Sequence, residues 1–243
     1  MLRIAGKSDV GKKRNGNEDS FFVAKLSPDV VYAVVCDGMG GENGGHIASF
    51  HAVEQIRKTM EDGYRDGFGE NSLKHLMISA VAGANAQVFS MAQKDDSLKG
   101  MGTTVVLAVV RESTVHIAYA GDSRAYLIDQ QGARQLTRDH SMVQLMVDRG
   151  ELSAEEAQYH PEKHYITRAL GVSGQLDVDY LEEEMPESAT VLLCSDGLSN
   201  YLDQEDLFQA IWGKDPVAAA DGLIRQANAM GGADNITAVL IAR

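Results

Sequence analysis

Four aspartates stand at the ends of short apolar runs, each in a setting of small residues: Asp37, Asp122, Asp196 and Asp234. Such runs, rich in β-branched residues and bounded by glycine, are typical of buried strands. Because a fold commonly gathers carboxylates at one point from the ends of distant strands, we expect these four side chains to meet. Carboxylates so placed repel one another and lose hydration unless a cation neutralises them. Since every ligand on offer is an oxygen, the pattern predicts a pair of hard divalent cations.

A glycine-rich stretch follows Asp37, with five glycines among the eight residues 38–45. Its backbone could turn sharply and approach a ligand, which would make the Gly38 carbonyl a further hard oxygen beside Asp37. The stretch has neither the Gly-Lys-Ser/Thr of a phosphate-binding loop nor a Gly-x-Gly-x-x-Gly pattern. Taken alone, it is also typical of a glycine-rich turn that binds nothing.

Arg14 lies in the segment RNGNED, residues 14–19, just before a strand-like run. An arginine beside carboxylates is often only a salt-bridge partner, but a guanidinium also matches phosphate with two parallel hydrogen bonds. In the same segment, Glu18 or Asp19 could hold a metal-bound water. Together with the aspartates, Arg14 suits a site that binds a phosphoryl group.

Motifs for other catalytic chemistry are missing from the sequence. It has no Gly-x-Ser-x-Gly, no His-Glu-x-x-His and no Asp-x-Asp-x-Thr. The seven histidines show no zinc-binding spacing. We therefore expect neither a nucleophilic serine, nor a zinc site, nor a phosphorylated aspartate.

Length and composition favour one domain of a cytoplasmic protein. The 243 residues contain no linker and no repeat, and the formal net charge of −13 argues against a nucleic-acid-binding surface. The N-terminus lacks a signal peptide, and no apolar run is long enough to span a membrane. Cys36 and Cys194 are expected to be buried thiols, although a disulfide between them stays open.

Periodicity predicts antiparallel strands, because many of the connections between them are short. The expected strands are 2–8, 20–25, 30–36, 103–110, 114–120, 124–129, 190–195 and 236–242. Hairpin connections are expected at 112–113 and at 121–123. Strands interrupted by helices favour a sandwich of sheets with helices on its outer faces.

Helical spacing of apolar residues marks two long segments, 46–60 and 71–93, the second capped by Asn71 or Ser72. The region 137–170 is less regular, with a short helix at 141–147 and a capping box at 153–156. A later helix begins at Asp215-Pro216 and ends at Gly231-Gly232.

Seven short motifs occur in the order in which one known family carries them. They are RxxNED (14–19), DGxGG (37–41), GTT (102–104), GDSR (121–124), LTxDHS (136–141), SDGL (195–198) and DNxT (234–237). On these motifs the chain closely resembles the metal-dependent serine/threonine protein phosphatases of type 2C, the PPM family, in their bacterial single-domain form. The resemblance covers essentially the whole chain.

The resemblance implies an α+β fold, a four-layer α-β-β-α sandwich of two antiparallel sheets flanked by helices. Residues 1–243 would form a single catalytic domain with a flap subdomain at about 141–166. The implied cofactors are two Mn²⁺ or Mg²⁺ ions in the core, with a possible third.

The family's metal ligands map onto matching positions here. Asp37 resembles the catalytic ligand that bridges both metals, and the Gly38 carbonyl resembles a ligand of the first. Asp196 and Asp234 resemble ligands of the second metal. Asp122, with Asp196, resembles the ligands of a weaker third metal.

Two further catalytic residues are implied in the same way. Asp19 resembles the residue that anchors a metal-bound water, and Arg14 the arginine that binds the substrate phosphate. Met39 departs from animal members, which commonly carry a histidine there as the proposed general acid. A thioether donates no proton, so that role is not transferred to this chain.

The implied activity is hydrolysis of phosphoserine and phosphothreonine in proteins, by direct attack of a metal-bridging hydroxide. The expected substrates are phosphoproteins made by a partner serine/threonine kinase, and the kinase itself. The expected protein is a monomer that binds neither nucleic acid nor membrane. Two alternatives are a phosphatase acting on a regulatory phosphoprotein such as an anti-sigma antagonist, and a non-catalytic pseudophosphatase that binds phosphoproteins.

Overall fold

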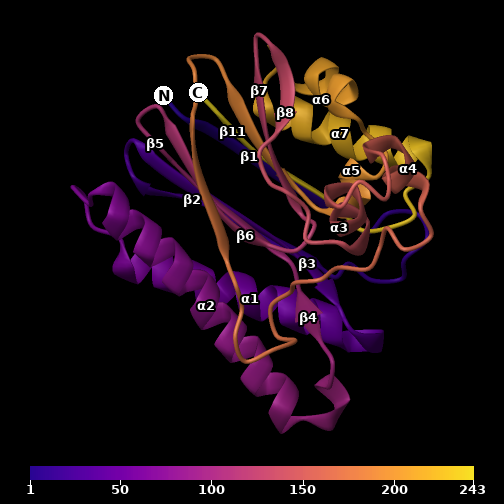
Figure 1. Ribbon diagram of the computed structural model, residues 1–243. Coiled ribbons are helices and arrows are strands. Elements are labelled where there is room, and N and C mark those ends of the chain that lie inside the picture. The colour runs from indigo at the N-terminus through magenta and orange to yellow at the C-terminus, as the bar shows by residue number, and fades with distance from the viewer.

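Two antiparallel sheets lie face to face in the computed structural model, which describes residues 1–40 and 44–243 (Figure 1). The first sheet has five strands, in the order β1 (Arg3–Asp9), β11 (Ile236–Ala242), β10 (Thr190–Cys194), β7 (Arg124–Asp129) and β8 (Gly132–Gln135). The second runs β2 (Asp19–Ser27), β3 (Val30–Met39), β5 (Val105–Arg111), β6 (Thr114–Ala120) and β9 (Asp179–Glu184). A two-residue strand, β4 (Gly102–Thr103), pairs with the end of β3.

Helices cover the outer face of each sheet. On the second sheet lie α1 (Gly41–Gly63) and α2 (Glu70–Lys94), followed by the short 3-10 helix η1 (Asp96–Leu98). The first sheet is covered by α5 (Asp196–Ser199), α6 (Gln204–Ile211) and α7 (Pro216–Met230). This arrangement confirms the predicted four-layer α-β-β-α sandwich. No helix in the described ranges is long and apolar enough to cross a membrane.

The central strands are continuously apolar because both of their faces are buried. In β3, Tyr32 and Val34 pack against α1 and α2, whereas Val31, Ala33 and Val35 pack against the other sheet. The period-2 alternation of a strand therefore divides one apolar run between two cores. Burial on both sides fixes the register, because a slip of one residue would exchange the two sets.

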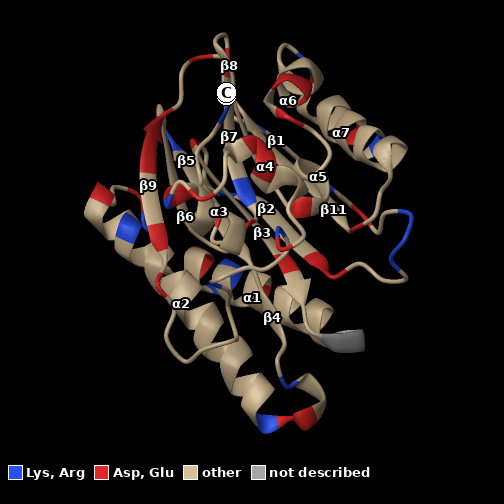
Figure 2. Cartoon of the chain, turned by 45° about the vertical axis from the view of Figure 1, so that its right-hand side comes forward, with Lys and Arg blue, Asp and Glu red and all other residues tan. Residues whose placement is uncertain are grey.

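Five elements were not predicted: β8, β9, α5, α6 and the 3-10 helix η1. The strands β8 and β9 lie at the sheet edges, where one partner suffices and the outer side chains are polar. β9 has the sequence DYLEEE, and its acidic residues are visible along the strand in Figure 2. It therefore lacks the apolar run that marked the other strands. The start of α6 does carry a readable signal, a capping box formed by Asp203 and Asp206.

Two local predictions are corrected. The connection 121–123 is not a hairpin, because β6 pairs with β5 and β9 whereas β7 pairs with β10 and β8. Short as it is, this connection crosses from one sheet to the other. The N-cap of α2 is Gly69 rather than Asn71 or Ser72, which already lie inside the helix.

Other local predictions are confirmed. Residues 112–113 connect β5 and β6 as a hairpin. The box of Ser153 and Glu156 opens α4 (Ala154–Tyr159), and Asp215 caps α7, which ends at Gly231. The short helix expected at 141–147 is α3 (Met142–Asp148).

Candidate metal centre

Strand register places two carboxylates opposite each other. Asp19, at the start of β2, is the direct partner of Asp37 near the end of β3. Like charges directly opposite in an antiparallel pair are destabilising. The Asp37 backbone is nevertheless firmly held: its N–H donates to Thr104 Oγ1 (2.9 Å), and its carbonyl accepts from Thr104 N (2.9 Å) and Thr103 Oγ1 (2.8 Å). The motif at 102–104 thus fixes the bridging candidate.

The first sheet supplies two more carboxylates at the same end of the sandwich. Asp196 follows β10 and Asp234 precedes β11, and these strands are antiparallel neighbours, so the two positions lie close together. Gly197 permits this approach, since a Cβ there would lie 2.0 Å from the Asn235 carbonyl oxygen. A residue with a side chain at position 197 would push the Asp196 segment away from β11.

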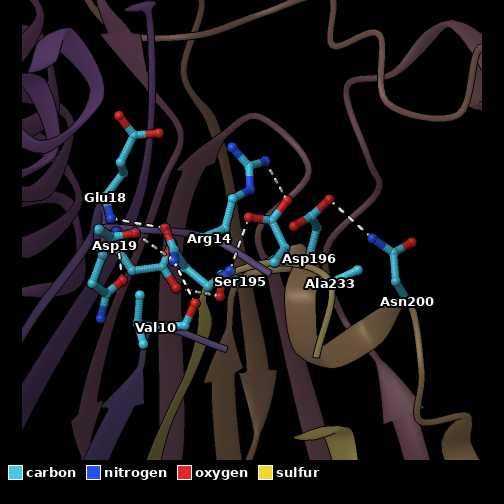
Figure 3. A network of polar contacts seen from close by, with 12 residues as sticks. Val10, Arg14, Glu18, Asp19, Ser195, Asp196, Asn200 and Ala233 are labelled. Carbon is cyan, nitrogen blue, oxygen red and sulfur yellow. Dashed lines mark hydrogen bonds and ion pairs between the residues drawn. The ribbon is translucent and has the colours of Figure 1, made fainter. Parts of the chain in front are cut away.

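Asp19 joins the two sheets (Figure 3). Its Oδ2 accepts hydrogen bonds from Ser195 Oγ (2.7 Å) and Thr237 Oγ1 (2.6 Å), both in the first sheet's strand ends. Its Oδ1 is buried and has no hydrogen-bond partner in the described part of the chain. A buried, unpaired carboxylate oxygen is costly, so this atom requires a partner that residues 1–40 and 44–243 do not supply.

Gly38 is enclosed by backbone. A Cβ at this position would lie 2.1 Å from the Gly45 carbonyl oxygen and 2.6 Å from that of Glu18. Only glycine therefore allows the end of β3 to meet α1 and the start of β2. Residues 41–43 of the same glycine-rich stretch lie outside the described residues.

Burial and mutual repulsion raise the pKa values of Asp37, Asp19 and Asp122. Burial, followed by the charges of Asp19 and Asp196, raises the pKa of Asp37 well above its ordinary value. Burial raises the pKa of Asp19 to about 7, against two hydrogen bonds that lower it. The pKa of Asp122 is raised to about 8 by burial and by Asp196. Bound cations would reverse each of these shifts, because they stabilise the ionised form.

Asp122 is positioned by the motif at 136–141. His140 N donates to the Gly121 carbonyl (2.9 Å), and Gly121 N donates to His140 Nδ1 (3.1 Å). Arg124 binds both oxygens of Asp139, with its Nε 3.0 Å from each. Sequence reasoning singled out this motif but gave its residues no role.

Arg14 reaches the cluster from a loop before β2. Its Nη2 lies 2.8 Å from Asp234 Oδ2, and this hydrogen bond raises the pKa of the guanidinium. Asn235 anchors the loop: its Nδ2 donates to the carbonyls of Val10 and Gly16 (3.0 Å each), and its Oδ1 accepts from Glu18 N (2.8 Å). Asn235 is therefore a positioning residue that sequence reasoning did not assign.

The predicted ligands lie at the same end of the sandwich, but their side chains do not all converge on one point. Within residues 1–40 and 44–243, no three Asp, Glu, His or Cys side chains converge closely enough to hold an ion. Asp234 engages Arg14, and Asp196 Oδ2 accepts from Asn200 Nδ2 (2.9 Å). Hard cations such as Mg²⁺ retain several waters and use one or two carboxylates. The carboxylates, the Gly38 carbonyl and the unpaired Asp19 oxygen fit such ions.

A cleft of about 900 Å³ opens beside the cluster, with Asp122 and Asp196 in its wall. One side is formed by α3 and α4, the other by residues 199–206. The segment carrying α3 and α4 is closed at its base by a β-bridge between Ser141 and Ile166. It also brings His164, which sequence reasoning missed, near Asp196. Burial and the charge of Asp234 raise the pKa of Asp196, and His164 opposes that rise.

Cys36 and Cys194 are buried and free, so the disulfide alternative is wrong. Burial raises the pKa of both thiols, which therefore stay protonated small apolar groups. Their places beside Asp37 and Asp196 reflect the apolar strands that end there.

Fold and site together define a class of protein: a two-sheet, metal-dependent phosphatase whose carboxylates collect at one end of both sheets. The family model for protein phosphatase 2C matches residues 6–219. The chain is 36% identical to the serine/threonine phosphatase stp of Listeria monocytogenes, over 98% of this chain and 94% of the relative. It is 33% identical to the protein phosphatase PhpP of Streptococcus pneumoniae, over 99% of this chain and 97% of the relative.

Solved structures agree. The Streptococcus agalactiae serine/threonine phosphatase superposes with a TM-score of 0.92 at 30% identity, covering 99% of each chain. The chain belongs to the protein phosphatase 2C family. This confirms the predicted resemblance and fold, and with them the predicted class of enzyme, a metal-dependent phosphoprotein phosphatase.

Proposed function

We propose that this chain hydrolyses phosphoserine and phosphothreonine in proteins with the cluster at Asp37 as its catalytic centre. Asp37 would bridge two Mn²⁺ or Mg²⁺ ions, with Gly38 as carbonyl ligand of the first, and Asp196 and Asp234 as ligands of the second. The observation that carries the proposal is the meeting of carboxylates from both sheets around Asp37. When bound, the cations would supply an activated water and neutralise charge on the phosphoryl group.

Manganese is supported by a structural neighbour. The catalytic domain of the serine threonine protein phosphatase PstP was solved in complex with two manganese ions, and it superposes on this chain with a TM-score of 0.86 at 30% identity, covering 99% of this chain and 97% of that domain. The all-oxygen donor set accepts either Mn²⁺ or Mg²⁺. Asp122, with Asp196, would hold a third, weaker ion at the edge of the cleft.

Arg14 would hold the substrate phosphate. One of its nitrogens is paired with Asp234, and a guanidinium has five N–H donors, so donors remain for phosphate oxygens. The Asp234 contact aims the arginine at the cluster, since the side chain is otherwise half exposed. Asp19 would orient a water within the cluster through its unpaired oxygen.

The protein substrate would enter by the cleft beside Asp122 and Asp196. At about 900 Å³ the cleft is large enough for a peptide segment, and Tyr159 and Lys163 of the flap line it. We place the flap at about 141–166 within a single catalytic domain of residues 1–243. The substrates would be cytoplasmic phosphoproteins made by a partner serine/threonine kinase, including the kinase, and the enzyme would act as a monomer.

Hydrolysis of a phosphothreonine peptide with Mn²⁺ tests the proposal. Activity should require Mn²⁺ or Mg²⁺, disappear with EDTA and be abolished in Asp37→Asn. Asp129→Asn is a matched control, because Asp129 caps a turn at the end of β7, away from the cluster, and should keep full activity. A folded, Mn²⁺-loaded protein that leaves the peptide intact would refute the proposal and favour a phosphoprotein-binding pseudophosphatase.

A further inference from the structure

Two hydroxyl groups in the first sheet hold the carboxylate that reaches across from the second. Ser195 Oγ and Thr237 Oγ1 both donate to Asp19 Oδ2, at 2.7 and 2.6 Å. Both residues are fully buried, and Thr237 N donates in turn to Ser195 Oγ (3.0 Å). The three side chains therefore form a closed group between the sheets, shown in part in Figure 3.

With Asp19 ionised, the hydrogen-bond directions in this group follow from one another. Thr237 has one hydroxyl proton and gives it to Asp19, so the 2.8 Å contact with Ser8 must use the Ser8 proton. Ser8 Oγ in turn accepts from Asn17 Nδ2 (2.7 Å), and Asn17 Oδ1 accepts from Asp19 N (3.1 Å). The chain Asn17, Ser8, Thr237, Asp19 is thus a ring of hydrogen bonds that all run one way, and such chains strengthen one another.

One carboxylate oxygen of Asp19 takes no part in this ring. Oδ2 is saturated by two hydroxyls, while Oδ1 is buried without a partner in the described ranges. With Oδ2 fixed, the carboxylate cannot rotate to exchange its two oxygens without breaking both bonds. Asp19 and Asp37 are direct partners in the register of β2 and β3, so the unpaired oxygen belongs to a carboxylate that lies beside Asp37.

We infer that Thr237 and Ser195 are positioning residues for the metal centre: they hold Asp19 so that its Oδ1 serves the bound cations. This inference rests on the proposed metal centre, and it extends that proposal to residues that touch neither metal nor substrate. Partners that orient the groups around a metal commonly change metal affinity by about 10–100-fold when removed. Thr237 and Ser195 should therefore set metal affinity, although their side chains bind no ion.

Calorimetric titration with Mn²⁺ tests the inference. Thr237→Val removes the hydroxyl and keeps the shape, and it should weaken Mn²⁺ binding by about 10-fold or more. Thr237→Ser retains the hydroxyl and should restore affinity close to that of the unmodified protein. Thr190→Val is the matched control, because Thr190 is a buried threonine in β10 at the far end of the same sheet. It should leave Mn²⁺ affinity unchanged.

A double-mutant cycle shows whether the hydroxyl acts through Asp19. In an Asp19→Ala background, Thr237→Val should cause no further loss of Mn²⁺ affinity. An additional loss there, or unchanged affinity in Thr237→Val alone, would overturn the inference. If Thr237→Val does not fold, Ser195→Ala provides the same comparison. The titration needs no turnover, so a protein inert on phosphopeptides would refute the proposed function and leave this result readable.

Discussion

Gly197→Ala tests how closely the Asp196 segment must approach β11. The new Cβ would lie 2.0 Å from the Asn235 carbonyl oxygen and 2.9 Å from its carbon. Both atoms belong to the backbone, so no side-chain rotation can relieve the contact. To restore an ordinary separation, the segment carrying Asp196 must move by roughly 1.5 Å or more, since heavy atoms in contact lie about 3.5–4.0 Å apart.

The expected cost follows from this displacement. Overpacking a well-packed site costs about 1–3 kcal/mol, and a backbone clash belongs at the upper end. Replacing glycine by alanine also stabilises the fold by about 0.4–1 kcal/mol, because it lowers the conformational entropy of the unfolded chain. The net loss is about 2 kcal/mol, which for a chain of this size lowers Tm by roughly 4–8 °C. Because Asp196 moves with the segment, Mn²⁺ affinity should also fall by about 10–100-fold.

Thermal unfolding and Mn²⁺ titration measure the two effects together. Gly222→Ala is the control: Gly222 lies inside α7, and a Cβ there would meet nothing within 4 Å. That substitution should raise Tm slightly, because alanine favours a helix interior over glycine. Gly197→Ala with the Tm and Mn²⁺ affinity of the unmodified protein would refute the reasoning.

Three further predictions concern single side chains. Arg14→Ala should lower kcat/KM for a phosphothreonine peptide by roughly 10–100-fold, as expected for lost charge-assisted hydrogen bonds. Its Tm should stay almost unchanged, because the ion pair with Asp234 is solvent-exposed. An unchanged kcat/KM would contradict the role of Arg14 in binding phosphate. Asp122→Ala should reduce turnover while calorimetry still shows the two tighter Mn²⁺ sites, and loss of those sites would place Asp122 in the core. Burial lowers the pKa of His116, so at this residue the unfolded chain binds more protons once pH falls below about 6.5, which costs stability as pH falls. The raised pKa values of Asp19, Asp37 and Asp122 act in the opposite sense, so the test is the difference between two proteins. From pH 7.5 to 5.5 the Tm of His116→Gln should change more favourably than that of the unmodified protein, and an equal change in both would exclude the contribution of His116.

The sequence predicts those elements best that are buried on both faces. The strands at 114–120, 124–129 and 236–242 were predicted close to their observed bounds, because each contains a largely apolar run. The edge strand β9 escaped prediction since four of its six residues are acidic. The pairing of strands was harder still to predict from sequence. Residues 121–123 look like a hairpin, and only the three-dimensional structure shows that they cross between sheets.

The residues of the candidate site were likewise predictable only in part. Residue types alone predicted carboxylates at strand ends, but left Glu18 and Asp19 as alternatives. The register favours Asp19, because Asp19 lies opposite Asp37, whereas the Glu18 side chain lies against Gly45 of α1. The roles of Asn235 and Thr237 depend on contacts between segments more than 200 residues apart in sequence. No local pattern carries that information.

The number of Mn²⁺ ions bound tests the central claim most directly. Calorimetric titration should find two tight sites in the unmodified protein and their loss in Asp37→Asn, with Asp129→Asn unchanged. Two tight sites that survive in Asp37→Asn would contradict the account, because the cations would then not be held by the carboxylate on which both sheets converge.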